Sequence, residues 1–125
     1  MEQQDFSKYI TNLDIKFEHL KKIDISPIIK SCKNKWFNQT LTKVNDSVIR
    51  LGILEGEYHW HKHSDEDEFF FVIEGQLFID LAEETIELLK GQGITITKNI
   101  LHRPRTLQKT IVLMVETSNI IPTGN

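Results

Sequence analysis

The feature that most constrains the fold is the apolar pattern that begins at Trp36 and continues through the rest of the chain. Apolar residues there recur at alternate positions in short runs, and alternate side chains of a strand share one face. Turn-forming pairs such as Asn45-Asp46 and Glu74-Gly75 separate the runs. About eight or nine short strands at close spacing predict an all-β sandwich or barrel rather than alternating strands and helices. The strands are expected at residues 36–44, 47–54, 58–63, 69–73, 76–81, 85–89 and 94–97, around residue 102, and at 110–116.

The first third of the chain has a different period, which predicts a helix. Thr11 or Asn12 could cap a helix that runs to about Lys22, and Ser26-Pro27 interrupts the pattern. We therefore expect a helical extension over residues 1–35, followed by one barrel domain over residues 36–125. The apolar residues that recur at helical steps of three and four are Phe6, Tyr9, Ile10, Leu13, Phe17 and Leu20.

The composition limits the cellular location and the classes of binding partner that we expect for this protein. A chain of 125 residues with 39% hydrophobic and 26% charged residues suits one globular domain. The net charge of -3 offers no basic surface for nucleic acid, and no apolar run approaches the roughly 18 residues that a membrane span needs. Cys32 is the only cysteine, and the stretch MEQQDFSKYI lacks the pattern of a secretory signal. We expect a cytoplasmic protein with neither nucleic-acid nor membrane partners.

The stretch HWHKHSDEDEFFFVIEG, residues 59–75, concentrates the groups that could do chemistry. On a strand, His61 and His63 would point to one face, whereas Trp60 and Lys62 would point to the other. Two imidazoles on one face can bind one cation, and neutral imidazole suits zinc, iron, nickel, copper or, with carboxylates added, manganese. The spacing therefore predicts one half of a metal site.

A carboxylate from the next strand is expected to complete this half. The four-residue loop after His63 is long enough to turn the chain and bring Glu68 alongside. Phe70 and Val72 would then share the inward face of Glu68 and form apolar walls. The three residues expected to face outward are Phe69, Phe71 and Ile73.

Several neighbouring polar residues compete for roles in the site. Asp65, Glu66 and Asp67 read as a solvated acidic loop, although Glu66 or Asp67 could replace Glu68 as the ligand. His59 shares the strand phase of His61 and His63, and we expect it beside the site rather than on the metal.

Aromatic and basic residues near the motif have simpler expected roles. Tyr58 and Trp60 should face away from the ligands and pack between sheets or in a dimer interface. His59 and Tyr58 are the candidates for a catalytic role beside the metal ligands, but neither is expected to bind the metal. Arg103 and Arg105 should point outward if His102 points inward. His102 is the one histidine outside the stretch that a returning strand could bring to the site.

Two motifs resemble those of the cupin superfamily. Residues 61–75 read H-x-H-x4-E-x6-G, the first cupin motif. Residues 91–106 follow the second, G-x5-P-x-G-x2-H-x3-N, with His102 at the histidine and with three departures in the motif, which are Thr97, Asn99 and Thr106. The chain resembles small single-domain bacterial cupins of a group loosely labelled as similar to mannose-6-phosphate isomerase.

The resemblance implies a double-stranded β-helix, or jelly-roll, barrel with a divalent metal in its mouth. The ion would be iron, manganese, nickel or zinc, and its ligands would be His61, His63, Glu68 and His102. The departures fall on turn chemistry, and Asn99 keeps the residue type that best tolerates a left-handed backbone after glycine.

The predicted function is a metal-dependent enzyme acting on a small sugar-like or keto/hydroxy-acid metabolite, by isomerisation, epimerisation or ring-cleaving dioxygenation. Beyond His59 and Tyr58 the sequence offers no obvious general base. The alternative is a non-catalytic cupin module that binds a metal or small ligand, and a metal-free scaffold is a third interpretation. We expect a small-molecule ligand and a homodimer built on outward aromatic residues.

Overall fold

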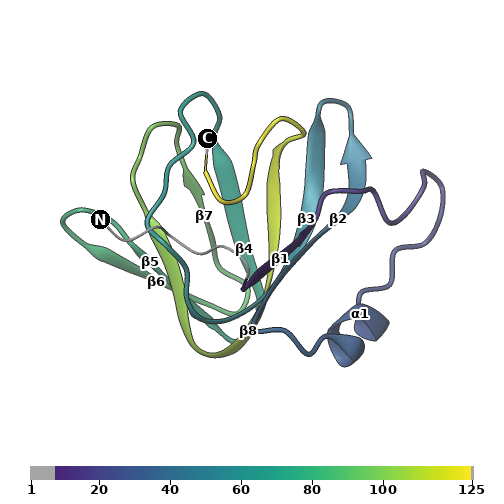
Figure 1. The fold of residues 1–125 in the computed structure, drawn as a ribbon, viewed down its shortest axis with the longest axis horizontal. Coiled ribbons are helices and arrows are strands. Elements are labelled where there is room, and N and C mark those ends of the chain that lie inside the picture. The colour runs from purple at the N-terminus through teal and green to yellow at the C-terminus, as the bar shows by residue number, and fades with distance from the viewer. Residues whose placement is uncertain (1–7, 125) are drawn as a thin grey trace.

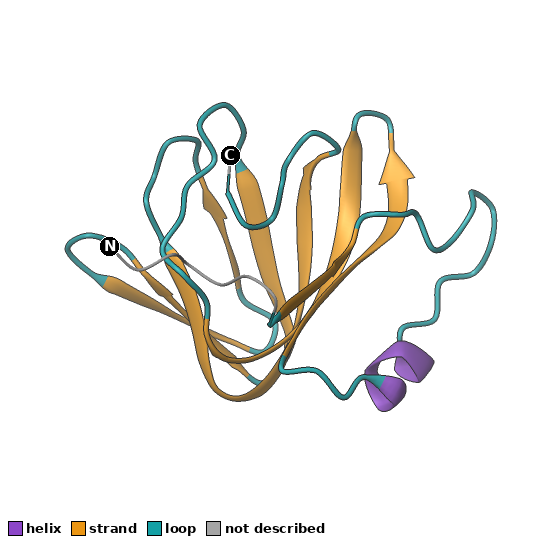
Figure 2. Cartoon of the chain, viewed as in Figure 1, coloured by secondary structure: helices purple, strands orange, loops and turns teal. Residues whose placement is uncertain are grey.

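The computed structural model describes residues 8–124, and it is built almost entirely from strands (Figure 2). This confirms the all-β prediction. Within these residues the elements are β1 (Tyr9–Asn12), α1 (Ser26–Ser31), β2 (Trp36–Val44), β3 (Ser47–Glu57), β4 (Glu68–Glu74), β5 (Gln76–Asp80), β6 (Thr85–Leu89), β7 (Gly93–Ile96) and β8 (Arg103–Thr117).

The long strand β8 ties the sheet together. It pairs antiparallel with β3 along one edge and, along the other, with β5 near its start and with β4 near its end. The main strand order is β1-β2-β3-β8-β4-β7, and β6 pairs with β5. Figure 1 shows the sheet curling, with β2 and β3 on the right, β5 and β6 on the left, and β8 along the bottom. Curling gives each central strand an inner and an outer face.

The two faces of β3 carry different side chains. Arg50, Gly52 and Leu54 point inward, toward a cluster that includes Trp36 and Phe70 on other strands. Alternate residues point outward into a second cluster, because side chains two apart share a face. The buried members of this outer cluster are Ile28, Leu41, Leu51, Ile53 and Ile111.

The helix predicted for the first third is wrong for the described residues; Phe6 lies outside them. Tyr9–Asn12 form strand β1, which pairs in parallel with β2 so that Tyr9 lies opposite Trp36. Leu20, placed on the helical stripe, is fully exposed with a φ of 67°. Local periodicity could not reveal this pairing, because the partner strand lies far along the chain.

The helix that does form is α1, on the outer face. It begins where the sequence was expected to break, because Pro27 fits the first helical turn, whose N–H groups need no partner within the helix. Ile28 is buried against the outer face of the sheet. No helix among residues 8–124 is long and apolar enough to cross a membrane.

The strand expected over residues 58–63 is also wrong. β3 extends instead to Glu57, with a register shift between Leu54 and Gly56, and the chain then leaves the ladder. Within residues 58–63 the structure assigns one isolated antiparallel bridge, between His61 and His102. The segment that carries the histidines is therefore an irregular stretch anchored by that bridge.

Candidate metal site

Four side chains converge at one end of the barrel interior. His61, His63, Glu68 and His102 each offer one donor atom, and these atoms lie within 4.8 Å of one another. All four residues are buried. The structure thus brings together the predicted ligand set, and Glu66 and Asp67, the alternatives to Glu68, lie outside this cluster.

Backbone pairing positions His61 and His102 against each other. The His61 N–H donates to the His102 carbonyl at 3.0 Å, and the His102 N–H donates back at 2.9 Å. The Asn99 N–H donates to the His63 carbonyl at 2.7 Å, and Asn99 has a φ of 66°. The left-handed backbone expected at Asn99 is therefore confirmed, and it lets the loop before His102 close on the His63 segment.

Hydrogen bonds set which ring nitrogen faces the cluster. Nδ1 of His61 lies 3.1 Å from the His59 carbonyl oxygen, and Nδ1 of His102 lies 2.9 Å from the Ile100 carbonyl oxygen. Because a carbonyl oxygen only accepts, each Nδ1 carries the proton and donates. The Nε2 lone pairs of both rings then remain available to a metal, the arrangement that orients ligand histidines in metal sites.

Burial and neighbouring charges also prepare the imidazole of His61. Desolvation by burial is the largest influence and lowers its pKa to about 3, with repulsion from His102 in the same direction. The ring is therefore neutral near pH 7, which is the form that binds a metal.

The carboxyl group of Glu68 is held in its ionised form. Burial alone would raise its pKa, but hydrogen bonding to Glu116 and the nearby rings of His102 and His63 hold it well below the usual range. Its Oε1 lies 3.4 Å from Nε2 of His102 and 3.5 Å from Nε2 of His63. Glu68 is therefore an anionic oxygen donor that faces the imidazole rings of the cluster.

A second buried acid, Glu116, lies beside Glu68 on the neighbouring strand β8. The two residues are directly opposite in the β4–β8 register. Burial, followed by the negative charge of Glu68, raises the pKa of Glu116 well above its usual range, so Glu116 holds the proton of this pair. Arg50 donates from Nη1 to Glu116 Oε1 at 2.6 Å and to the Ile120 carbonyl at 3.3 Å.

The residues present fit a divalent metal ion. Glu68 Oε1 and His102 Nε2 are buried and make no hydrogen bond, which is costly unless another group satisfies them. One carboxylate and three imidazoles are also the donor types that bind zinc, iron, manganese or nickel. Ligation itself stays a prediction, but the geometry leaves these atoms facing one point.

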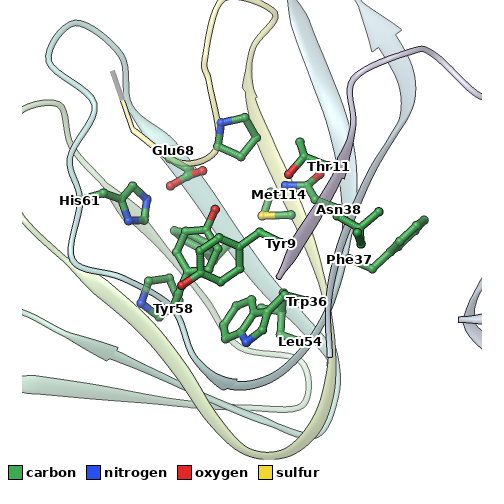
Figure 3. A pocket seen from close by; sticks show the side chains of 14 residues that line it. Tyr9, Thr11, Trp36, Phe37, Asn38, Leu54, Tyr58, His61, Glu68 and Met114 are labelled. Carbon is green, nitrogen blue, oxygen red and sulfur yellow. The ribbon is translucent and has the colours of Figure 1, made fainter. Parts of the chain in front are cut away.

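A pocket adjoins the cluster and is lined in part by β1. The space within it and at its open mouth totals about 450 Å³, and both His61 and Glu68 contribute to its lining. Figure 3 shows Tyr9, Tyr58 and Trp36 gathered on the side away from Glu68. Any ligand in this pocket would therefore contact the metal ligands at one end and aromatic rings at the other.

Tyr58 differs from the expectation drawn from the sequence, whereas His59 agrees with it. Tyr58 does not face away from the ligands, since it lines the pocket and its ring centroid lies 5.2 Å from that of His61. The bulge in β3 and the end of that strand break the alternation on which the prediction depended. His59 does lie beside the site, and its Nε2 donates to the Thr123 carbonyl at 2.7 Å.

The remaining predictions about neighbouring residues agree with the structure. Phe70 and Val72 are buried on the inner face. Asp65 and Asp67 are exposed, and Asp67 accepts a hydrogen bond from the Lys98 N–H at 2.9 Å. Arg103 and Arg105 lie outside the pocket lining and both donate to Asp80.

Sequence reasoning missed several inward-facing residues. Trp36 and Asn38 lie two apart on β2 and both line the pocket, a spacing that a strand rule could have recognised. Arg50 and Glu116 are charges within otherwise apolar inward runs, which is the signal for a functional polar pair. Tyr9 carried no such signal, because the helical interpretation hid its strand.

Comparisons with known proteins agree with this fold and site. The family model for the cupin domain matches residues 50–117. Uncharacterized protein YdbB of Bacillus subtilis (strain 168) is 38% identical over 97 residues, which are 77% of this chain and 86% of that protein. A shorter match, 38% over 61 residues, links 49% of this chain to 38% of polyketide synthase CurC of Streptomyces cyaneus.

A solved structure shares the same architecture. The crystal structure of a cupin-2 domain containing protein from Shewanella frigidimarina superposes with a TM-score of 0.72 at 29% identity, covering 76% of this chain and 93% of that one. These matches account for both the two sequence motifs and the curled sheet. The chain belongs to the cupin domain family, and its strands form the double-stranded β-helix of that family.

Proposed function

We propose that this protein is a metal-dependent enzyme that acts on a small metabolite bearing a hydroxyl or carbonyl group, by isomerisation, epimerisation or ring-cleaving dioxygenation. One observation carries the proposal. Buried donor atoms of His61, His63, Glu68 and His102 face a single point, and that point borders a pocket that is open to solvent.

The chain's own residues would share the work in a simple way. His61, His63, Glu68 and His102 would hold the ion, which supplies Lewis acidity toward a bound oxygen or redox chemistry. Burial, aided by the charges around it, raises the pKa of Tyr58 above its ordinary value of 10.0. The Tyr58 hydroxyl therefore keeps its proton at neutral pH and can donate a hydrogen bond to a ligand, but it is a poor general base.

The pocket lining favours an uncharged substrate body. Among the described residues that line it, none is a lysine or an arginine, so a phosphate group would find no cationic side chain there. This argues against sugar phosphates. A hydroxyl or carbonyl oxygen needs no such partner, because the metal end of the pocket can receive it.

One relative is consistent with this substrate class. CurC is named as a polyketide synthase, and polyketide chains carry carbonyl and hydroxyl groups. The match covers less than half of either protein, so the pocket rather than the relative carries the proposal.

The test begins with metal binding and then asks for turnover. Calorimetric titration with zinc, manganese and ferrous iron should give one site per chain, and His63→Ala should abolish it. A crystal of the loaded protein should show anomalous density between the four ligands. Turnover on a panel of hydroxy and keto metabolites should vanish on chelation and return with the metal.

Two outcomes would overturn the proposal. Turnover that survives chelation in metal-free samples would show that the reaction does not need the site. Metal binding without turnover across the panel would instead favour the alternative, a cupin module that binds its ligand without transforming it.

A further inference from the structure

The aromatic end of the pocket is built by three rings from three separate segments. Tyr9 comes from β1, Trp36 from β2 and Tyr58 from the irregular segment after β3. Ring centroids are 4.2 Å apart for Tyr9 and Tyr58, 4.9 Å for Trp36 and Tyr58, and 5.9 Å for Tyr9 and Trp36. These are distances of direct aromatic packing, so the three rings form one continuous wall, which we call the aromatic wall.

Strand pairing explains why this wall faces the pocket. In the β1–β2 register, Tyr9 lies opposite Trp36 and Thr11 lies opposite Asn38. Residues two apart share a face, and all four of these residues line the pocket. The N-terminal strand therefore contributes side chains to the site as well as an edge to the sheet.

The lining outside the aromatic wall is also largely apolar. Met114 of β8, Leu54 of β3 and Phe70 of β4 belong to the inner core cluster and line the pocket. The absence of lysine and arginine from the described lining leaves Glu68 as its one charged group. A ligand body in this space would be surrounded by rings and aliphatic carbon.

At the end of the pocket away from the metal cluster, a polar atom of the lining lacks a hydrogen-bond partner within the described protein. The side-chain oxygen Oδ1 of Asn38 is buried and accepts no hydrogen bond. A buried acceptor without a donor is costly, and such atoms commonly wait for a ligand or a water. Figure 3 shows Asn38 with Thr11 and Met114, on the far side of the pocket from His61. The pocket thus offers an acceptor at the end opposite the metal cluster.

We propose that the pocket selects a flat, unsaturated and uncharged molecule of about one ring. One oxygen of the molecule would face His61 and Glu68, its body would lie against the aromatic wall, and an O–H or N–H at its other end would donate to Asn38. The inference rests on the proposed function for the metal end and goes beyond it by assigning the substrate class. A saturated ring would have no π face to pack against the three rings of the wall.

A pair of matched probes tests the inference on the zinc-loaded protein. The first is 4-hydroxybenzamide, which is flat, uncharged and carries an oxygen at one end and an O–H at the other. The second is its saturated counterpart, 4-hydroxycyclohexanecarboxamide, with the same polar groups. Because the two probes share their polar groups, the aromatic contacts alone distinguish them, and we expect the flat probe to bind up to about tenfold more tightly.

The two tryptophans provide the readout and the control. Trp36 belongs to the wall, whereas Trp60 is 41% exposed and lies against Arg103. In a nitrogen-15 spectrum, the flat probe should shift the indole signal of Trp36 and leave that of Trp60 unchanged. Trp60→Phe assigns the signals, and Trp60→Leu should leave the tenfold preference intact.

Substitutions in the wall and at its polar end complete the test. Trp36→Leu or Tyr9→Leu should reduce the preference for the flat probe to about twofold or less. Asn38→Leu should weaken the flat probe by about three- to tenfold without altering zinc affinity. If Trp36→Leu fails to fold, Tyr9→Leu and Asn38→Leu still decide the matter, since each changes a different contact.

The outcomes separate this inference from the proposed function. Equal affinity for the two probes, or a shift of Trp60 rather than Trp36, would overturn the substrate class while leaving the metal site intact. Failure to bind zinc would overturn the proposed function. The probe titrations, repeated on chelated protein, would then still report whether the aromatic wall prefers a flat ligand.

Discussion

The inner and outer faces of β3 and β8 belong to the same strands but bury different chemistry. On the outer face, Leu51 and Ile53 pack with Ile111 under α1 in a wholly apolar cluster. On the inner face, Arg50 donates to the buried Glu116, so that its cation pairs with the one negative charge that Glu68 and Glu116 share; the Arg50 and Glu116 side chains are 3% and 0% exposed. One face therefore has no buried charge to satisfy, whereas the other keeps charges next to the candidate metal site.

The difference separates stability from function within a single sheet. An apolar face stabilises the fold in proportion to the area it buries. Buried polar groups add little or cost stability unless they are fully paired, so they persist where another role maintains them. On the inner face of β3 and β8, the Arg50–Glu116 pair lies beside the candidate ligand Glu68 of β4, which indicates that these charges serve the site.

The largest effect on stability is expected where the inner ion pair is broken. Arg50→Met would leave the Glu68–Glu116 pair without its cation and free the Ile120 carbonyl, at a cost of about 4 kcal/mol in unfolding free energy. Urea unfolding would measure it. The control is Arg103→Met, whose partly exposed ion pairs with Asp80 and Glu57 should cost at most about 1 kcal/mol. Equal losses in the two variants would remove the contrast between buried and surface pairs.

The outer face should respond in stability alone. Leu51 is fully buried, so Leu51→Ala should lower the unfolding free energy by about 3 kcal/mol through lost burial and a residual cavity. Zinc affinity of the folded variant should not change, because Leu51 points away from the site. Leu107→Ala, at a position 75% exposed, is the matched control and should stay within about 0.5 kcal/mol. A Leu51→Ala protein that lost zinc affinity would show that the two faces are coupled.

Ligand substitution on the inner face should give the opposite pattern. His102→Ala should weaken zinc binding by at least about 100-fold, equivalent to about 2.7 kcal/mol, because it removes one of the four donor atoms while the backbone bridge to His61 remains. In chelated protein the variant should be as stable as wild type or more so, since it relieves a buried polar atom without a hydrogen bond. His19→Ala provides the comparison at an exposed histidine and should leave zinc affinity unchanged.

How much of the molecule could be predicted from its sequence depends on whether the structural signal is local or non-local. Strand alternation predicted the barrel, and the spacing of His61, His63 and Glu68 predicted half of the cluster, because these are local signals. The resemblance of the second motif to that of the cupins added His102. Tyr9 and Tyr58 were misplaced for non-local reasons. Tyr9 enters the site only through parallel pairing with β2, and Tyr58 through a bulge that ends the alternation of β3.

The smallest expected effect is a pH dependence that isolates His61. In the folded, chelated protein its pKa falls from the ordinary 6.5 to about 3, mainly through burial. Below pH 6.5 the unfolded chain binds a proton that the folded protein does not, so stability is lost as pH falls from 6.5 toward 3. Between pH 7 and pH 5 this single group should account for about 2 kcal/mol. His61→Gln removes it, so the chelated variant should lose about 2 kcal/mol less than wild type over that range in urea unfolding. If the two proteins lost the same unfolding free energy between pH 7 and pH 5, His61 would be solvated in the metal-free fold. Water would then reach the inner face of the sheet more readily than the outer face of the same strands.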